Sequence, residues 1–217
     1  MSNIHIFYHV GQINNWEFIV QEQLHALQIS GLMSACDGFH VGVSGNLPIQ
    51  GLPSKAKVTH HPSDLWTEEK GTIRMIKDFC TDHGKGSKIL YLHTKGVRWN
   101  KPSINCWRLY MEYFCVHKWR TCIADLQEHD CVGSLWATAT LNYPSHFSGN
   151  FWWANSQYIT DKVNHNLIET NSRFDREFWI GSGNPNAKGY GIKNAPVLGD
   201  YFFENVFSSE TMCEDMQ

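Results

Sequence analysis

The stretch Ile89–Gly96, which reads ILYLHTKG, restricts the possible folds of this chain more than any other segment. Its apolar run is bounded by small turn residues on both sides, as in a strand buried at the centre of a parallel sheet. Open α/β sheets bind ligands just beyond the carboxyl ends of their strands. The pattern therefore predicts that His93 and Lys95 stand at a ligand site, since lysine suits phosphate and imidazole can exchange protons. The alternative is an ordinary polar turn with a solvated lysine.

Strand and helix patterns alternate around this segment. Strands are expected at residues 4–10, 38–43, 57–60 and 131–136, and helices at 15–30, from Ser63 or Thr67 to His83, and at 103–128. Alternation at these lengths favours an α/β fold, with a mostly parallel central sheet flanked by helices in an α/β/α sandwich.

The pattern becomes less regular after residue 136. Residues 142–150 are expected to form a polar loop and residues 151–154 a short strand, followed by a short helix that begins at Asn155 or Ser156. A glycine-rich loop is expected at 181–191, and the acidic tail beyond it is expected to fray. The whole chain, 1–217, is interpreted as one domain.

Composition excludes several classes of protein. The 217 residues carry 18 basic and 21 acidic side chains, a net charge of −3, so nothing indicates a nucleic-acid or anionic-membrane partner. Seven cysteines without a C-x-x-C pair argue against a zinc site or a disulfide framework and favour a reducing, cytoplasmic setting. No leader sequence and no transmembrane segment are expected. The chain also lacks the phosphate-loop, dinucleotide-binding and serine-hydrolase motifs.

Three segments that follow expected strands carry candidate ligand-binding groups. Together they offer backbone donors, small residues, imidazoles and one cation, which suits a nucleoside diphosphate better than a neutral ligand. Beside His93 and Lys95, the candidates are His9, Val10, Gly11, Ser44, Gly45, Asn46, Thr94 and Gly96. The alternative for each segment is a plain strand end.

A second group of candidates lies in the later part of the chain. The segment HFSGNFWWAN at 146–155 mixes aromatic residues with amides, so a sugar could bind there by stacking on tryptophan and by hydrogen bonds. The candidates are His146, Asn150, Trp152, Trp153 and Trp179. The alternative is an edge strand whose tryptophans belong to the core. Glu177 is a candidate base or hydroxyl acceptor, with a salt bridge to Arg173 or Arg176 as its alternative.

The motifs YLHTKG and HFSGNFWWANSQYI together resemble small GT-A-type glycosyltransferases, which occur in bacterial polysaccharide gene sets and in large algal viruses of the chlorovirus kind. The strand ending in HTK is also similar to rhamnan-synthesis F proteins. This resemblance covers residues 4–11, 38–46, 89–96 and 146–159. It implies a GT-A fold with a nucleotide-sugar half at about 1–100 and an acceptor half at about 101–217. Many GT-A enzymes hold Mn²⁺ or Mg²⁺ with Asp-x-Asp after the central strand, whereas this chain has Leu-His-Thr-Lys there and no Asp-x-Asp anywhere.

The resulting hypothesis is a glycosyltransferase that moves a sugar, such as rhamnose or another hexose, from UDP or dTDP to a hydroxyl of a glycan or glycoprotein acceptor. His93 and Lys95 would stabilise the leaving diphosphate in place of a metal, so no metal ligands and no firm cofactor are assigned. Glu177 would contact the acceptor. The main alternative is a non-catalytic carbohydrate-binding module that uses a Trp152 and Trp153 surface. A metal-requiring transferase with His93 among its ligands is a further alternative. A metal-dependent glycosidase would need paired carboxylates, and Asp175 and Glu177 are too weakly placed to support one.

Overall fold

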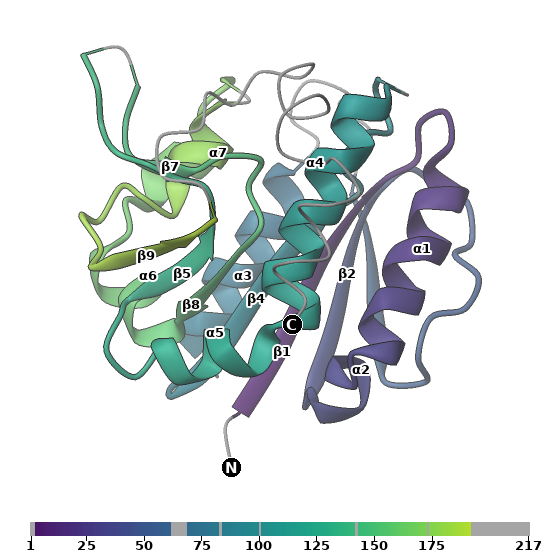
Figure 1. Cartoon of the computed structure of the whole chain (residues 1–217), viewed down its shortest axis with the longest axis horizontal. Coiled ribbons are helices and arrows are strands. Elements are labelled where there is room, and N and C mark those ends of the chain that lie inside the picture. The colour runs from purple at the N-terminus through teal and green to yellow at the C-terminus, as the bar shows by residue number, and fades with distance from the viewer. Residues whose placement is uncertain are drawn as a thin grey trace.

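A seven-stranded, mostly parallel sheet with helices on both faces forms the centre of the computed structural model (Figure 1). The structure describes residues 3–61, 69–82, 84–99, 101–141, 143–172 and 174–191. The strand order is β3-β2-β1-β4-β8-β5-β9. The α/β class expected from sequence is therefore confirmed. The expected helix start at Ser63 or Thr67, its end at His83, the loop start at Asn142, Arg173 and the acidic tail lie outside the described residues.

Four neighbouring parallel strands make up the first part of the sheet. They are β1 (Asn3–Gly11), β2 (Gly38–Ser44), β3 (Ala56–His61) and β4 (Ser87–His93), connected through α1 (Trp16–Ile29), α2 (Leu32–Ala35) and α3 (Lys70–Asp82). All four strands were expected, with differences of one or two residues at their ends. The short helix α2 was not expected. It follows Gly31, whose φ of 76° ends α1 and turns the chain.

The second part of the sheet contains β5 (Cys131–Ser134), β8 (Trp152–Asn155) and β9 (Ala187–Tyr190). Strand β8 lies between β4 and β5 and is antiparallel to both. Strand β9 pairs in parallel with β5, so the expectation of a simple glycine-rich loop at 181–191 is wrong. Residues 187–190 have a low intrinsic preference for strand because they contain glycine, and the backbone pairing with β5 stabilises them as a strand.

The long helix expected at 103–128 is interrupted. It consists of α4 (Pro102–Glu112), a π-helical turn η1 (Tyr113–His117) and α5 (Trp119–Asp125). The wider turn of a π-helix changes which backbone carbonyl groups accept hydrogen bonds from within the helix. Here the Cys115 carbonyl accepts a hydrogen bond of 2.8 Å from the indole of Trp153 on β8, so the interruption fits the helix to the sheet.

A small hairpin and three short helices complete the described chain. The elements are β6 (Trp136–Ala137), β7 (His146–Phe147), α6 (Ser156–Lys162), η2 (His165–Ile168) and α7 (Phe174–Trp179). The segment that joins β6 to β7 projects from the body of the molecule beside α7 (Figure 1). Strand β7 lies inside the polar loop expected at 142–150, so that loop is shorter than the sequence suggests.

The two faces of the sheet carry separate apolar layers. Because side chains alternate along a strand, Tyr8 and Leu92 pack on the side of α1, α4 and α5, whereas Phe7 and Tyr91 pack on the side of α3, α6 and α7. Within the described residues, no helix has the length and apolar character needed to cross a membrane.

Candidate functional site

The carboxyl ends of β1 and β4 mark the place where the strand order reverses. From β1 the chain continues to β2 on one side, and β4 later adds on the other side. Such a switch point is where open α/β sheets bind their ligands. His9 lies opposite His93 in the register of β1 and β4, and Gly11 lies opposite Ser44 on β2. All three strand ends predicted from sequence thus meet at one edge, at the top of Figure 1.

His9 is a buried histidine at this switch point. Its side chain is 2% exposed, and its Nδ1 lies 2.8 Å from the Thr72 hydroxyl on α3. Burial lowers the pKa of His9 to about 3, so the ring is neutral at ordinary pH, although nearby Glu69 opposes that shift. The other ring nitrogen, Nε2, is buried without a hydrogen-bond partner among the described residues. Leaving such an atom unsatisfied costs about 1–3 kcal/mol, which a ligand could recover.

Glu69 immediately precedes α3 and was missed by the sequence analysis. Its Oε2 accepts hydrogen bonds of 2.7 Å from the Tyr91 hydroxyl and from the Asn150 amide. Burial alone would raise its pKa. Electrostatic interaction with His93 and His9 and the two hydrogen bonds outweigh burial and lower the pKa to about 2. The side chain is therefore a fixed negative charge that joins the two halves of the sheet.

The turn at Gly149 brings three of the predicted residues together. His93 Nε2 donates to the Gly149 carbonyl at 3.0 Å, and the Gly149 amide donates to Glu177 Oε1 at 2.9 Å. Asn150 follows with a φ of 63°. Its side-chain oxygen accepts from the Trp152 indole at 2.9 Å, while its amide donates to Glu69. Asn150 is 3% exposed, so its amide organises the site rather than reaching into solvent.

Lys95 lies on the α4 side of the same turn. Its Nζ is 3.6 Å from the ring centroid of Trp107, which is a cation–π contact. An added Cβ on Gly149 would lie 3.0 Å from the same indole, so Lys95 and the Gly149 turn share one aromatic neighbour. Gly96 follows with a φ of 101°, a conformation that favours glycine and turns the chain toward α4.

Several predicted nucleotide-binding groups are already used within the protein. The Thr94 hydroxyl accepts the Gly11 amide at 3.0 Å, and the Val10 side chain is fully buried. The Gln12 side chain accepts the Leu47 amide and donates to its carbonyl, both at 2.8 Å, and so holds the turn of residues 44–47. The expectation of free backbone donors at Gly11 is therefore wrong, because that amide ties β1 to β4. Gly45 is half-buried and Asn46 is exposed at this turn.

The predicted stacking surface for a sugar does not exist. Trp152, Trp153 and Trp179 each have 0% exposure and belong to the core. Trp152 and Trp153 are consecutive on β8 and so point to opposite faces, both of which are covered because β8 is a central strand. The indole N–H groups of both are satisfied inside the protein. The carbohydrate-binding module that relied on their surface loses its basis for the same reason. His146 is half-buried, with Nδ1 donating to the Pro144 carbonyl at 2.8 Å.

A buried ionic network supports the end of β4 from the α1 side. Gln23 Nε2 donates to the His93 carbonyl at 3.1 Å and to Glu112 at 2.9 Å, and Tyr8 donates to Gln23 at 2.7 Å. Arg108 binds Glu112 at 2.9 Å, four residues along the same helix. Arg108 and Glu112 are both 2% exposed. This network holds the backbone of His93 and was not expected from the sequence.

Arg176 does not form the ion pair that was considered for Glu177. The Arg176 guanidinium is buried and donates to the Thr170 hydroxyl at 3.0 Å and to the Thr170 carbonyl at 2.5 Å. Glu177 Oε1 instead accepts the Gly149 amide. Across the described ranges, no group of three or more His, Cys, Asp or Glu side chains is placed to hold a metal ion.

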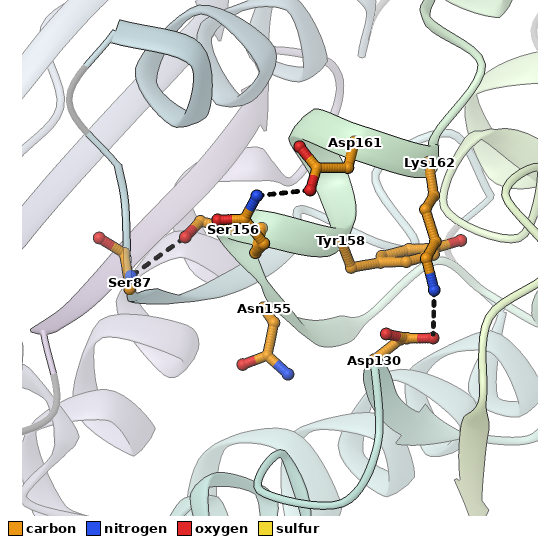
Figure 2. A pocket seen from close by; sticks show the side chains of 9 residues that line it. Ser87, Asp130, Asn155, Ser156, Tyr158, Asp161 and Lys162 are labelled. Carbon is orange, nitrogen blue, oxygen red and sulfur yellow. Dashed lines mark hydrogen bonds and ion pairs between the residues drawn. The ribbon is translucent and has the colours of Figure 1, made fainter.

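A polar pocket of about 280 Å³ lies elsewhere. It is found at the start of β4 and the end of β8, which is the sheet edge opposite the switch point (Figure 2). Its polar groups bind one another, since Ser156 accepts the Ser87 amide at 3.1 Å and Lys162 lies 3.9 Å from Asp130. The pocket shares no lining residue with the switch-point cluster.

These features define a mixed α/β protein with a polar cluster at the carboxyl edge of a mostly parallel sheet. The chain belongs to the family described as a domain of unknown function (DUF8361), which matches residues 5–175. No curated protein matches the chain.

Distant similarity to solved structures extends over most of the chain. A manganese complex of Rv0371c from Mycobacterium tuberculosis H37Rv is 8% identical, with a TM-score of 0.48 over 92% of this chain and 93% of that one. A second structure of Rv0371c has 8% identity and a TM-score of 0.47, with 92% of each chain covered. The bifunctional IspDF from Campylobacter jejuni is 12% identical, with a TM-score of 0.42 over 92% of this chain and 52% of that one.

Proposed function

We propose that this chain is a glycosyltransferase of the GT-A type, which moves a sugar from a nucleoside diphosphate, UDP or dTDP, to a hydroxyl of a glycan acceptor. The observation that carries this assignment is the convergence at the switch point. His9, His93 and Lys95 come from the first half of the chain, and Asn150 and Glu177 come from the second. His9 Nε2, which has no hydrogen-bond partner among the described residues, supports a ligand at this edge.

The proposed reaction breaks the bond between the anomeric carbon and the β-phosphate oxygen. The acceptor oxygen forms a new bond to that carbon, and its proton passes to a base. Lys95 stabilises the negative charge on the departing diphosphate, an effect that is largest where donors are already in place. Glu177, whose carboxylate accepts the Gly149 amide, serves as the acceptor-side base.

The hydrogen bond of His93 limits what this residue can do. Because Nε2 donates to the Gly149 carbonyl, a neutral His93 ring has only an acceptor at Nδ1. It can donate to a phosphate oxygen only when protonated. Lys95 then supplies positive charge of the kind that a metal supplies in other transferases.

Calorimetry of the full chain with UDP, dTDP and GDP tests this function. Wild type should bind UDP or dTDP more tightly than GDP, and Lys95→Ala should weaken that binding by about tenfold or more, which corresponds to about 1.4 kcal/mol. Lys118→Ala is a matched control, because Lys118 is exposed and its Nζ also lies over an aromatic ring, 5.4 Å from the centroid of Tyr113. Absence of nucleoside-diphosphate binding by wild type, or equal affinities for Lys95→Ala and wild type, would refute the assignment.

A further inference from the structure

An exposed group of aromatic side chains lies beside the switch-point cluster. Tyr143 and Phe174 are 59% and 53% exposed. Their rings surround Phe178, at centroid distances of 6.4 Å for Tyr143 and 6.5 Å for Phe174, and the ring of His146 lies 5.0 Å from Phe178. We call Tyr143, His146, Phe174 and Phe178 the aromatic platform.

Two ordered elements hold the aromatic platform. Phe174 and Phe178 are four residues apart on α7, so they share one face of the helix, while Arg176 and Trp179 face the core. Tyr143 comes from the segment that projects between β6 and β7 (Figure 1). That segment has its own hydrogen bonds, from the Thr140 amide to the Tyr143 carbonyl at 2.9 Å and from the Tyr143 amide to the Thr140 hydroxyl at 3.2 Å. The rings are therefore presented by structured backbone.

The aromatic platform is continuous with the candidate site. Glu177 lies three residues after Phe174 on α7, so the two side chains are neighbours, and the Glu177 carboxylate accepts the Gly149 amide at 2.9 Å. The Gly149 carbonyl in turn accepts from His93 at 3.0 Å. A ligand that lies on the platform therefore has one end within reach of Glu177.

The charges around the platform select against anionic partners. In the described residues 138–141, 143–146 and 174–178, the acidic side chains are Asp175 and Glu177. The one basic side chain of lysine or arginine type in these ranges is Arg176, which is buried and bound to Thr170 and Ser172. An anionic ligand on these described residues would meet two carboxylates, and their one guanidinium, that of Arg176, is buried. A neutral polyhydroxyl ligand suits the platform, because its C–H faces stack on aromatic rings and its hydroxyls donate to carboxylates.

We propose that the aromatic platform binds the acceptor as a neutral oligosaccharide, with a sugar ring stacked across Tyr143 and Phe174 and its reacting hydroxyl directed to Glu177. This assignment deepens the proposed glycosyltransferase function by naming the acceptor class and its binding surface. It also moves acceptor recognition from the buried tryptophans to exposed rings on α7 and the β6–β7 segment.

Retention of defined neutral oligosaccharides on a glycan array tests the aromatic platform. Wild type, the double variant Tyr143→Ala/Phe174→Ala and the control Phe18→Ala are compared. Phe18 is 61% exposed on α1 and lies outside the platform. Wild type and Phe18→Ala should retain the same oligosaccharides, and the double variant should lose at least about tenfold in apparent affinity, equivalent to about 1.4 kcal/mol. Nucleoside-diphosphate affinity and the urea unfolding midpoint should be equal in all three proteins.

Two results would overturn the platform. The first is that wild type retains no oligosaccharide, and the second is that the double variant retains the same set as wild type. If wild type forms a dimer in gel filtration and the double variant does not, while both retain the same oligosaccharides, the exposed rings mediate self-association and not acceptor binding. Retention that depends on the platform in a protein that binds no nucleoside diphosphate would support the platform and refute the transferase, so the two proposals fail separately.

Discussion

Replacing Glu69 with glutamine tests whether a permanent negative charge holds the switch-point cluster together. Glutamine keeps the size of the side chain and removes its charge. In the wild type, burial disfavours the carboxylate, but His93, His9 and hydrogen bonds from Tyr91 and Asn150 lower its pKa from 4.5 to about 2. The carboxylate is therefore more stable in the folded protein than in the unfolded chain.

The size of the effect follows from this change in pKa. A shift from 4.5 to about 2 corresponds to about 3 kcal/mol in the free energy of unfolding. Because the folded pKa is the lower one, the unfolded chain takes up the proton first as the pH falls. The contribution is fully present above about pH 5 and is lost as the pH approaches 2, with about 2 kcal/mol already lost at pH 3.

Urea denaturation at pH 6, 5, 4 and 3 measures this contribution. The difference in unfolding free energy between wild type and Glu69→Gln should shrink by about 2 kcal/mol between pH 6 and pH 3. His9, whose pKa burial lowers to about 3, destabilises both proteins as the pH falls and largely cancels in the difference. Glu128→Gln, at an exposed position, should follow wild type at every pH. A difference that stays constant from pH 6 to pH 3 would refute a fixed charge at Glu69.

Two further substitutions test the packing and the hydrogen bonds around the site. Gly149→Ala should lower the free energy of unfolding, measured in urea, more than Gly86→Ala does. Both glycines have a positive φ, so alanine at either position costs about 1–2 kcal/mol of backbone strain. Of the two, only Gly149 would place a Cβ against a neighbour, with Met111 Sδ at 2.5 Å. Equal losses would contradict this packing. Gln23→Leu should lower the free energy of unfolding by about 2–4 kcal/mol. It removes the hydrogen bonds to the His93 carbonyl and Glu112, and the buried Tyr8 hydroxyl loses Gln23 as its acceptor. The exposed control Gln28→Leu should stay within about 0.5 kcal/mol of wild type, and a similar result for Gln23→Leu would show that the network contributes little.

The first half of the fold could be predicted because its signals are local. Apolar runs such as Ile89–Leu92 and the helical spacing in residues 16–29 each indicate an element without reference to a partner. Strand β8 could also be predicted, but its position could not. A four-residue apolar run does not show whether it pairs at an edge or between two strands, and this difference decides that Trp152 and Trp153 are buried.

The candidate site shows the same limit. His93, Lys95 and Asn150 follow from motifs, whereas Glu69 has no distinctive local signal, because an acidic residue at the start of a helix is ordinary. Its role appears only when α3 is placed beside β4 and Asn150. Arg108 and Glu112 had a usable signal, since they are four residues apart on one helix, but such pairs usually lie on the solvated face.

The central antiparallel position of β8 links the completion of folding to the formation of the site. Until residues 152–155 are in place, β4 and β5 each have an open edge. The same chain movement that inserts β8 brings Gly149 to His93 and Asn150 to Glu69. A molecule in which β8 has detached therefore loses its sheet continuity and its ligand site at once. A ligand that binds at the switch point will consequently raise the free energy of unfolding of the second half of the chain. Once the site is saturated, this increase grows with the logarithm of the ligand concentration.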